Sequence, residues 1–398
     1  MTIDTHAYAT FLEKVAEDID IPPGKYQQAV DRYEAVGRWL EGGDYPGSAG
    51  TPDIYPQGSF RLGTVVRPIR GGVEADYDID LVCELAIAKD WTDPSTVKRV
   101  VGDRLNDHEL YRKMLDDEGK RCWTLIYSEQ DGIGFHLDVL PSVPDHRHAL
   151  DTSIAITHRQ GTSYRWSASN PRGYGNWFDE KNRAAFMRVL AEQKRSIMAR
   201  ASAIYASVDD VPDQLVRTPL QRVIQILKRH RDEMFNGGPD ADYAPISMIV
   251  TTLAAHLYQG EPDVYQALTA IVSKLHGHAG LVEHRAIEQA LASLQLIRRM
   301  PDGTWYIANP VNAEENFADR WHEDDHARAR AFFRWVDAVR EDLVDILAEN
   351  RLATARKRLG AALGASAATA HLGLISLTEA AASPARVHIG EAARPWRP

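Results

Sequence analysis

The segment that most constrains this fold runs from 57 to 85 and reads QGSFRLGTVVRPIRGGVEADYDIDLVCEL. Side chains alternate across a strand, so a strand over 77–85 presents Asp78 and Asp80 on one face and only apolar side chains on the other. Two adjacent carboxylates repel each other and lose hydration unless a cation lies between them. Mg²⁺ suits this position because it prefers oxygen ligands and completes its shell with water and substrate phosphates. The segment therefore indicates metal-dependent chemistry on a phosphorylated substrate.

Two further features extend this candidate site. Gly58 and Ser59 precede a short helix expected within 59–66, whose first amides can hold phosphate oxygens. A Gly-Ser pair alone is typical of an ordinary turn. It indicates a phosphate-binding turn only because the acidic strand follows it. A second strand, expected over 134–140, carries Asp138. A single Asp there is usually a strand-end or edge residue, but beside two other acids we expect a third metal ligand.

Composition limits the classes of function. The chain has 398 residues, 44% of them hydrophobic, which allows two domains or one large one. Its formal charge of −10 argues against a protein that grips a long nucleic acid. Cys83 and Cys122 are too few for a cysteine zinc site or a disulfide framework and fit a reducing cytoplasm. With no secretory signal pattern and no long apolar run, we expect a soluble cytoplasmic protein without a membrane partner.

The order of predicted elements suggests two halves. Helices and strands alternate up to SASNPRGYGNWF at 167–178, which we interpret as a turn-rich junction. Beyond it, helical periodicity covers 184–208, 219–235, 245–258, 264–275, 286–296 and 316–352. The pattern predicts an α+β catalytic core with N-terminal helices over residues 1–175 and a helical domain over 176–358. Residues 359–398, rich in Ala, Gly and Pro, are expected to form a partly disordered C-terminal tail.

Some residues admit more than one interpretation. Lys228 lies at the edge of the apolar stripe of the 219–235 helix, where a lysine either extends to solvent or enters a cleft, and the residues alone favour solvent. The pairs at 276/278 and 322/326 place histidines at short spacing, but no glutamate accompanies them as in zinc proteases. Surface or capping roles are expected for these histidines.

Gly58-Ser59, Asp78-Ile79-Asp80 and Asp138 together resemble the DNA polymerase β-like nucleotidyltransferase superfamily. More narrowly, the chain is similar to the bacterial cGAS/DncV-like nucleotidyltransferases, the cyclic-oligonucleotide synthases of CBASS antiphage defence. The phrases that carry this similarity are QGSFRLGT, YDIDLVCEL, SNPRGYGNWF and NPVNAEENFADRW. The resemblance extends from about 26 to about 352. It implies a polymerase β-like core with a mixed sheet, a helical C-terminal domain and an active site in the cleft between them.

The resemblance also implies a role for each carboxylate. Asp78 and Asp80 would bind two Mg²⁺ ions, for which Mn²⁺ can substitute, and Asp138 would join them at the metal that activates the acceptor hydroxyl. Asp76 could share their face, but Ile79 and Leu81 flank Asp78 and Asp80 as in the superfamily. In a two-metal site, one ion lowers the pKa of the attacking ribose hydroxyl and the other neutralises charge on the leaving pyrophosphate.

The remaining implied roles concern the substrate. Gly58 and Ser59 would cradle the donor β- and γ-phosphates, while Lys228 and Ser247 would contact the triphosphate from the helical domain, which reverses the solvent-facing interpretation of Lys228. The substrates would be ATP and GTP or another NTP, and the product a cyclic di- or trinucleotide that a downstream effector binds. The animal member of this lineage has a zinc-bearing DNA-binding insert that two cysteines cannot supply, so we expect no activation by long nucleic acid.

Two other functions stay open from sequence. A linear nucleotidyltransferase acting on an RNA, a protein or a small molecule would use the same carboxylates and phosphate turn. A catalytically silent nucleotide-binding regulator would share the fold, although all three acids are present. The sequence does not specify the base, the linkage, the activating signal or the oligomeric state.

Overall fold

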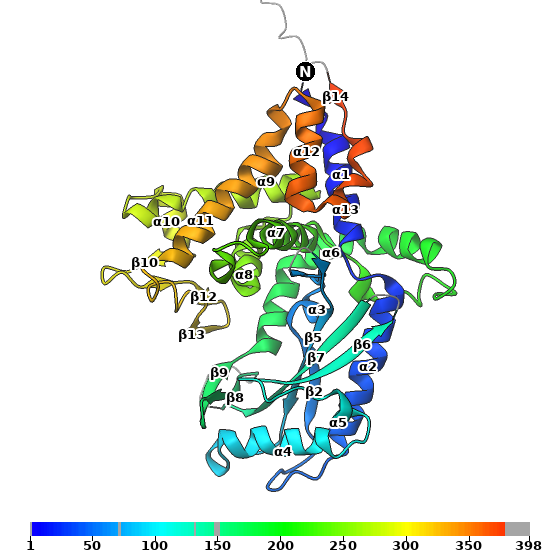
Figure 1. Cartoon of the computed structure of the whole chain (residues 1–398), viewed down its shortest axis with the longest axis vertical. Helices are drawn as coiled ribbons and strands as arrows, with labels where there is room; N and C mark the ends of the chain where they lie inside the picture. Colours follow the sequence, from blue (N-terminus) through cyan, green and yellow to red (C-terminus); the bar gives the residue numbers. More distant parts are fainter. Residues whose placement is uncertain (1, 71–72, 131–132, 147–151, 379–398) are drawn as a thin grey trace, which may run out of the picture.

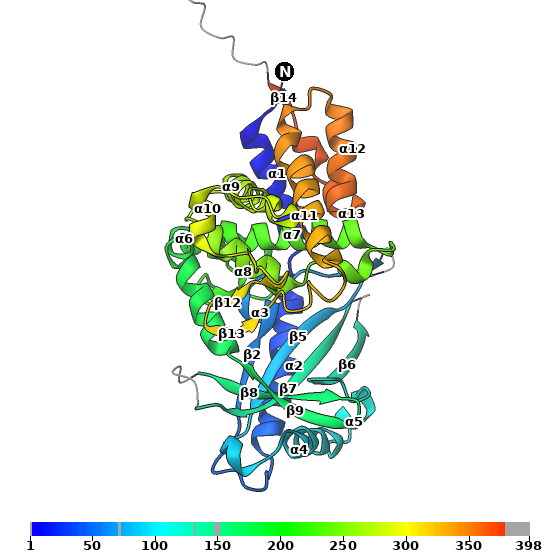
Figure 2. The same cartoon turned by 90° about the vertical axis from the view of Figure 1, so that its left-hand side faces the viewer.

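The computed structural model describes residues 2–70, 73–130, 133–146 and 152–378, and it has two lobes. Figures 1 and 2 show a lobe built on a sheet, drawn below, and a lobe of helices, drawn above. The fold is α+β with a mixed sheet, as expected. Among the described residues this sheet has six strands in the order β2-β5-β7-β8-β9, and β6 also pairs with β7.

The strand register sets the positions of the acids. The sheet strands are β2 (Asp53–Gln57), β5 (Tyr77–Glu84), β6 (Trp123–Gln130), β7 (Ile133–Pro144), β8 (Ile154–Gln160) and β9 (Ser163–Ser169). β5 and β7 are parallel, and their register places Asp80 opposite Asp138 and Asp78 opposite His136. β2 is antiparallel to β5 and ends with Gln57 opposite Asp80. Three strand segments distant in sequence therefore meet at one point.

The apolar face of β5 is covered by helices, as its alternation predicts. Ile79, Leu81 and Cys83 have no exposed surface and belong to a core shared with α2 (Pro23–Glu41) and α4 (Pro94–Asn106). Short elements complete this lobe: α3 (Gly58–Leu62), α5 (Tyr111–Met114) and the hairpin of β3 (Ile69–Arg70) and β4 (Val73–Glu74). On the opposite face of β5, Asp78 and Asp80 border the space between the lobes, while Val82 is buried in a small second cluster with Leu140.

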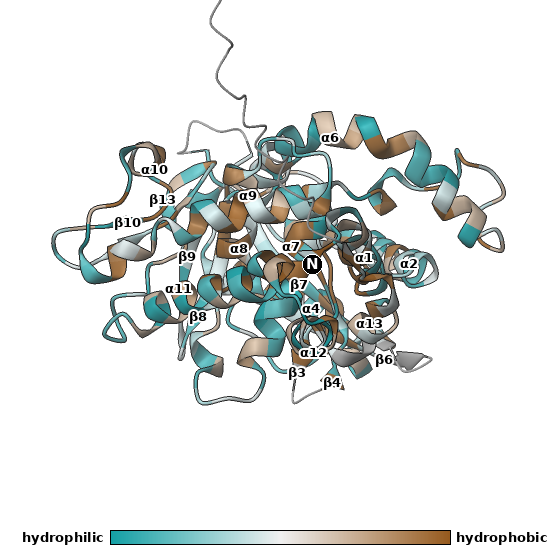
Figure 3. Cartoon of the chain, turned by 90° about the horizontal axis from the view of Figure 1, so that it is seen from above, coloured by the Kyte–Doolittle hydropathy of each residue, from teal (hydrophilic) through white to brown (hydrophobic). Residues whose placement is uncertain are grey.

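The helical lobe is organised around α7 (Pro219–Phe235). A capping box between Thr218 and Gln221 begins this helix, and most of its residues are buried. The other helices of this lobe are α1 (Thr5–Asp18), α6 (Pro171–Arg200), α8 (Ser247–Leu257), α9 (Val264–His276), α10 (Gln289–Leu294), α11 (Ala327–Val339), α12 (Leu352–Leu363) and α13 (Ala365–Thr369). Seen from above, these helices mix hydrophilic and hydrophobic residues along their length (Figure 3). In the described part of the chain, no helix combines the length and apolar character that crossing a membrane requires.

The structure corrects several boundaries within this region. The stretch 167–178 is not a turn-rich junction, because β9 continues to Ser169 and α6 begins at Pro171, with Asn170 accepting a hydrogen bond from Gly173 N at the helix start. Only part of the predicted helix 316–352 is α-helical, because α11 covers Ala327–Val339 and not the whole apolar pattern. Two hairpins precede α11, formed by β10 (Arg298–Arg299) with β11 (Trp305–Tyr306) and by β12 (Ala308–Asn309) with β13 (Asn312–Asn316).

Both ends of the described chain join the helical lobe. α1 contributes Tyr8, Phe11 and Leu12 to the core of the helices, and α12 contributes Leu359 and Leu363. β1 (Thr2–Ile3) pairs with β14 (Leu377–Thr378). The segment 359–378 is thus packed against the helical lobe. Residues 379–398 lie outside the described residues, so the partial disorder expected of the C-terminal tail stays a prediction. The division at 175 falls within α6 and stays a prediction.

Candidate active site

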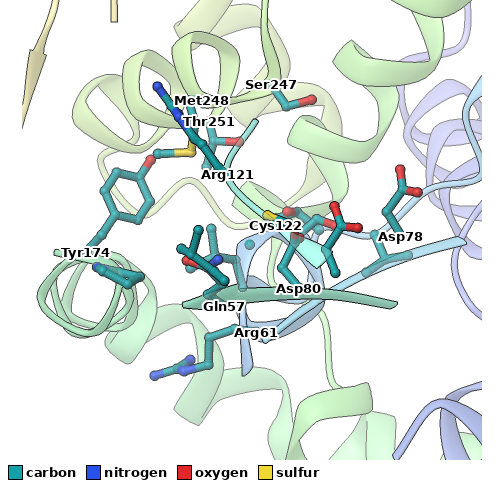
Figure 4. A pocket seen from close by; sticks show the side chains of 18 of the residues that line it. Gln57, Arg61, Asp78, Asp80, Arg121, Cys122, Tyr174, Ser247, Met248 and Thr251 are labelled. Atoms are coloured by element: carbon teal, nitrogen blue, oxygen red, sulfur yellow. The ribbon is translucent and has the colours of Figure 1, made fainter. Parts of the chain in front are cut away.

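A cavity of about 850 Å³ lies between the two lobes. The sheet lobe contributes residues of β2, α3, β5 and β7, and the helical lobe contributes residues of α6, α7, α8 and the β12–β13 hairpin. Every residue expected at the site lines this one cavity: Gly58, Ser59, Asp78, Asp80, Asp138, Lys228 and Ser247. Figure 4 shows Asp78 and Asp80 at one end, with Tyr174, Met248 and Arg121 toward the other.

Asp80 and Asp138 form the centre of the carboxylate group. They face each other across the parallel strands, and Thr124 Oγ1 on β6 donates a 2.5 Å hydrogen bond to Asp138 Oδ1. Burial raises the pKa of Asp80 to about 7, and the charges of Asp138 and Asp78 act in the same direction. The opposite effect of Lys228 is smaller. The fold therefore gathers negative charge here beyond what its own cations neutralise.

Asp78 is turned toward a histidine. Its side chain is 47% exposed, and Oδ1 lies 3.6 Å from His136 Nδ1 on β7. The other ring nitrogen, His136 Nε2, lies 3.7 Å from Asp76 Oδ2. Asp76 Oδ1 also accepts a hydrogen bond from Gly134 N, which joins the start of β5 to the start of β7. Asp76 thus has a structural contact outside the cavity wall, in keeping with the preference for Asp78 and Asp80.

The donor chemistry fits a hard divalent cation. Carboxylate oxygens are the preferred ligands of Mg²⁺, and a cation between Asp80 and Asp138 would offset the repulsion that raises the pKa of Asp80. Within the residues that the structure describes, no three His, Cys, Asp or Glu side chains are gathered closely enough to hold a metal. Asp78 would have to turn from His136 to complete the set.

Gly58 lies directly beside the Asp80 carboxylate. Its φ of +64° lies in the left-handed region, and a Cβ added there would lie 2.2 Å from Asp80 Oδ2. Only glycine allows this approach without displacing the carboxylate. Ser59 follows in α3 and lines the same cavity. The phosphate-binding role of both residues stays a prediction.

Lys228 and Ser247 lie on the helical side of the cavity. Lys228 is 4% exposed, and its Nζ donates to Thr64 O (2.9 Å) and Thr64 Oγ1 (3.2 Å). Burial lowers the pKa of Lys228 to about 7. The solvent-facing interpretation of Lys228 is therefore wrong, because α7 is buried on nearly all sides. Ser247 begins α8, and its Oγ accepts a 3.0 Å hydrogen bond from Arg231 Nη1.

Sequence analysis missed several residues of the cavity. Arg231 bridges α7 and α8, because it donates to Ser247 and to Pro245 O and also pairs with Asp232. Arg231 lies one helical turn after Lys228, so helical spacing could have found it. Glu315 and Asn309, on the β12–β13 hairpin, also line the cavity. No sequence spacing relates that hairpin to the strands of the sheet. The one sequence signal for it was the segment NPVNAEENF, which is part of the family resemblance.

The fold and the site together define a nucleotidyltransferase: three acids on adjacent strands face a cavity that a helical lobe closes with cationic side chains. Residues 6–182 match the family model of the Second Messenger Oligonucleotide or Dinucleotide Synthetase domain. A c-di-GMP synthase of Roseivirga ehrenbergii is 32% identical over 315 residues, which cover 78% of this chain and 72% of that protein. The chain belongs to the bacterial cGAS/DncV-like nucleotidyltransferases, the enzymes that make cyclic oligonucleotides.

Solved structures share this architecture. The CD-NTase CdnG of Bradyrhizobium diazoefficiens, solved in complex with GTP, has a TM-score of 0.67 at 23% identity and covers 92% of this chain and 98% of its own. The cyclic AMP-GMP synthase DncV of Vibrio cholerae has a TM-score of 0.51 at 17% identity, over 83% of this chain and 73% of its own. At these identities the likeness shows the fold.

Proposed function

We propose that the enzyme joins two NTPs, at least one of them GTP, into a cyclic dinucleotide with release of pyrophosphate, and that the reaction depends on Mg²⁺. The observation that carries this proposal is the pairing of Asp80 with Asp138 at the floor of a cavity that also holds Lys228 and Ser247. The cavity volume is near the upper end of the range for small-molecule sites, as binding of two nucleotides requires. GTP is favoured because the relatives include a c-di-GMP synthase and a CdnG structure with GTP.

In this mechanism the chain's own residues position the cations and the triphosphate and neutralise part of the triphosphate's charge. Asp78, Asp80 and Asp138 would hold the catalytic cations, and the hydrogen bond from Thr124 orients Asp138. The bound Mg²⁺ ions supply charge neutralisation and lower the pKa of the attacking hydroxyl. Lys228 and Ser247 bind the triphosphate from the helical side.

A second transfer in the same cavity closes the ring. After the first bond forms, the nucleotide whose hydroxyl attacked still carries its triphosphate, and the other nucleotide presents a ribose hydroxyl that has not reacted. That hydroxyl attacks the remaining α-phosphorus, and a second pyrophosphate leaves. The intermediate must turn over between the two steps, because the carboxylates lie at one end of the cavity only.

The biological role we propose is antiphage signalling in the cytoplasm. The cyclic product would bind a downstream effector, as the resemblance to CBASS synthases implies. Phage plaque counts on the native host with the wild-type enzyme, compared with the same host carrying the Asp78→Asn/Asp80→Asn double variant, test this role. Equal plaque counts in the two strains would contradict it.

The chemical proposal is tested with purified protein, Mg²⁺ or Mn²⁺, and GTP alone or paired with each other NTP. Mass spectrometry after phosphatase treatment identifies cyclic products, since a closed ring has no terminal phosphate to remove. We expect a phosphatase-resistant dinucleotide that contains guanine. This product should not form in reactions that contain EDTA. Linear or acceptor-linked products would instead support a linear nucleotidyltransferase.

A further inference from the structure

The backbone that follows the turn of Gly58 and Ser59 is held by side chains of the helical lobe. Four residues of α7 each donate a hydrogen bond to a carbonyl oxygen of the segment 62–67. The pairs are Gln221 with Leu62 (2.9 Å), Gln225 with Val65 (2.9 Å), Lys228 with Thr64 (2.9 Å) and Arg229 with Arg67 (3.4 Å). Helix positions separated in this way, by four, seven and eight residues from the first, lie on one face.

The segment depends on these contacts because residues 64–68 belong to no helix or strand. Thr64 and Val65 are buried, with 0% and 2% of their surface exposed. A buried backbone carbonyl needs a hydrogen-bond donor, and here side chains of α7 supply the N–H groups that a neighbouring strand would supply in a sheet. The segment follows a helix of the sheet lobe, but its position is set by the helical lobe.

The segment is also the exit of α3, the helix that begins at Gly58. α3 has only five residues, too few to be stable as an isolated helix, so its orientation depends on the chain at each end. At its start, Gln57 pairs with β5 in the sheet. At its end, Gly63 turns the chain at a φ of +63°, and a Cβ added there would lie 2.6 Å from Gln221 Nε2. One end of α3 is thus held by the sheet and the other by α7.

Gln225 connects the segment to the interior of the helical lobe. It has no exposed surface, its Nε2 donates to Val65 O, and its Oε1 accepts a 3.2 Å hydrogen bond from Arg222 Nη1. Arg222 in turn pairs with Asp20, which follows α1. Both ends of the Gln225 amide have partners, so this side chain cannot turn without leaving a buried group unpaired. Gln221 and Gln225 are not among the described residues that line the cavity, although Leu62 and Val65 are.

Lys228 differs from the two glutamines because it lines the cavity itself. In the proposed function its Nζ binds the triphosphate, which competes with Thr64 for the same N–H donors. The glutamines have no such second task, and they hold the segment on either side of Thr64. Resting on the proposed function, we propose that Gln221 and Gln225 are positioning residues, which keep α3 in the orientation that lets its first turn bind the donor triphosphate.

Two ligands distinguish this role from a purely structural one. A GTP analogue with a methylene group between the α- and β-phosphorus atoms keeps the triphosphate but cannot release pyrophosphate. GMP lacks the β- and γ-phosphates that the first turn of α3 would bind. Calorimetry with Mg²⁺ gives the Kd of each ligand without turnover. For the wild type, we expect the analogue to bind more tightly than GMP.

Gln221→Met and Gln225→Met remove the donors and nearly preserve the length of the side chain. We expect each substitution to raise the Kd of the analogue roughly 5-fold or more, the effect of one lost hydrogen bond at a buried carbonyl. The Kd of GMP should stay at its wild-type value. The KM for GTP should rise in parallel with the Kd of the analogue, because the loss concerns binding of the triphosphate.

Gln193→Met is the matched control. Gln193 is half-buried on α6, as Gln221 is on α7, and it also bonds one backbone N–H and one backbone carbonyl, both of Arg217 (2.8 and 2.7 Å). It does not contact the segment 62–67 through a hydrogen bond in the described structure, so the control should keep the wild-type Kd of both ligands. If Gln225→Met does not fold, as judged by its thermal unfolding, Gln221→Met still tests the proposal at its half-buried position.

The outcomes separate the positioning role from the proposed function. Folded glutamine variants that bind the analogue as tightly as the wild type overturn the positioning role and leave the proposed function intact. An equal loss of affinity for the analogue and for GMP also overturns it, because the substitutions would then disturb the cavity in general. A wild type that makes no cyclic dinucleotide from GTP, alone or paired with another NTP, overturns the proposed function itself.

Discussion

The two walls of the cavity are built in different ways. On the sheet side, Asp80 and Asp138 are fixed by the register of two parallel strands, and Gly58 lies so close to Asp80 that a side chain at this position would collide with it. On the helical side, Lys228 and Ser247 come from separate helices, and Glu315 comes from a short hairpin. One wall is set by backbone hydrogen bonds and the other by side-chain packing. We therefore expect changes on the sheet side to affect catalysis most, and changes on the helical side to affect substrate binding more.

The largest effect is expected for Asp80→Asn. This substitution removes a proposed metal ligand, and kcat should fall by at least about 100-fold because metal-assisted charge neutralisation is worth several kcal/mol. The substitution should also stabilise the metal-free protein near neutral pH, since it removes a repelled carboxylate. Quenched-flow or steady-state assays measure the first effect, and thermal unfolding in EDTA measures the second.

The pH dependence of that stability follows from the pKa of Asp80, which is raised to about 7 in the fold from an ordinary value of 3.8. The native state retains this proton over a pH range in which the unfolded state has lost it. The contribution of Asp80 to stability is thus fully present below about 4 and lost as pH rises through about 7. The difference in unfolding free energy between the wild type and Asp80→Asn should change across this window. A constant difference would contradict the buried, repelled carboxylate.

The next effect is expected for Gly58→Ala. An added Cβ would lie 2.2 Å from Asp80 Oδ2, and the φ of +64° disfavours any side chain. We expect a loss of about 1–3 kcal/mol in unfolding free energy from backbone strain, together with reduced activity because Asp80 is displaced. Gly161→Ala is the matched control, because Gly161 has a similar φ of +60° with no atom near its Cβ position. An equal effect of both substitutions on activity would contradict a specific role for Gly58.

The contrast between the sheet side and the helical side of the cavity also explains which features the sequence could predict and which it could not. The alternation in YDIDLVCEL predicted the strand, its buried face and its two acids, because a strand period of two is a local property. The predicted helix 219–235 has the same bounds as α7, since Thr218 and Pro219 mark its start. The start of α6 was missed because its Gly- and Asn-rich first turn resembles a loop, although Asn170 and Pro171 are typical of a helix start. Glu315 could not be placed, because nothing local relates a hairpin to a sheet far away in sequence.

On the helical side, Lys228→Met should mainly raise the KM for GTP, by roughly 10-fold or more, because it removes a cation expected at the triphosphate. The pKa of Lys228 is lowered to about 7 in the fold, from 10.5. The unfolded state therefore binds the proton more tightly, and the contribution of Lys228 to stability is lost as pH falls from about 10.5 to about 7. Lys228→Met should remove this slope from the unfolding free energy measured against pH. A fall in kcat with an unchanged KM would place Lys228 with the carboxylates instead and break the contrast between the walls.

The smallest effect is expected for Thr124→Val, which tests whether the sheet side is fixed by more than strand register. The substitution keeps the shape of the side chain and removes the hydrogen bond to Asp138 Oδ1. We expect a several-fold higher Mg²⁺ concentration at half-maximal activity and weaker Mn²⁺ binding by calorimetry, with a stability change of about 1 kcal/mol. Thr157→Val is the control, because Thr157 is buried on β8 and its Oγ1 has no partner among the described residues. If the two valine variants bind metal equally well, the hydrogen bond from Thr124 is not needed to orient Asp138. Strand register alone would then determine the geometry of the sheet side.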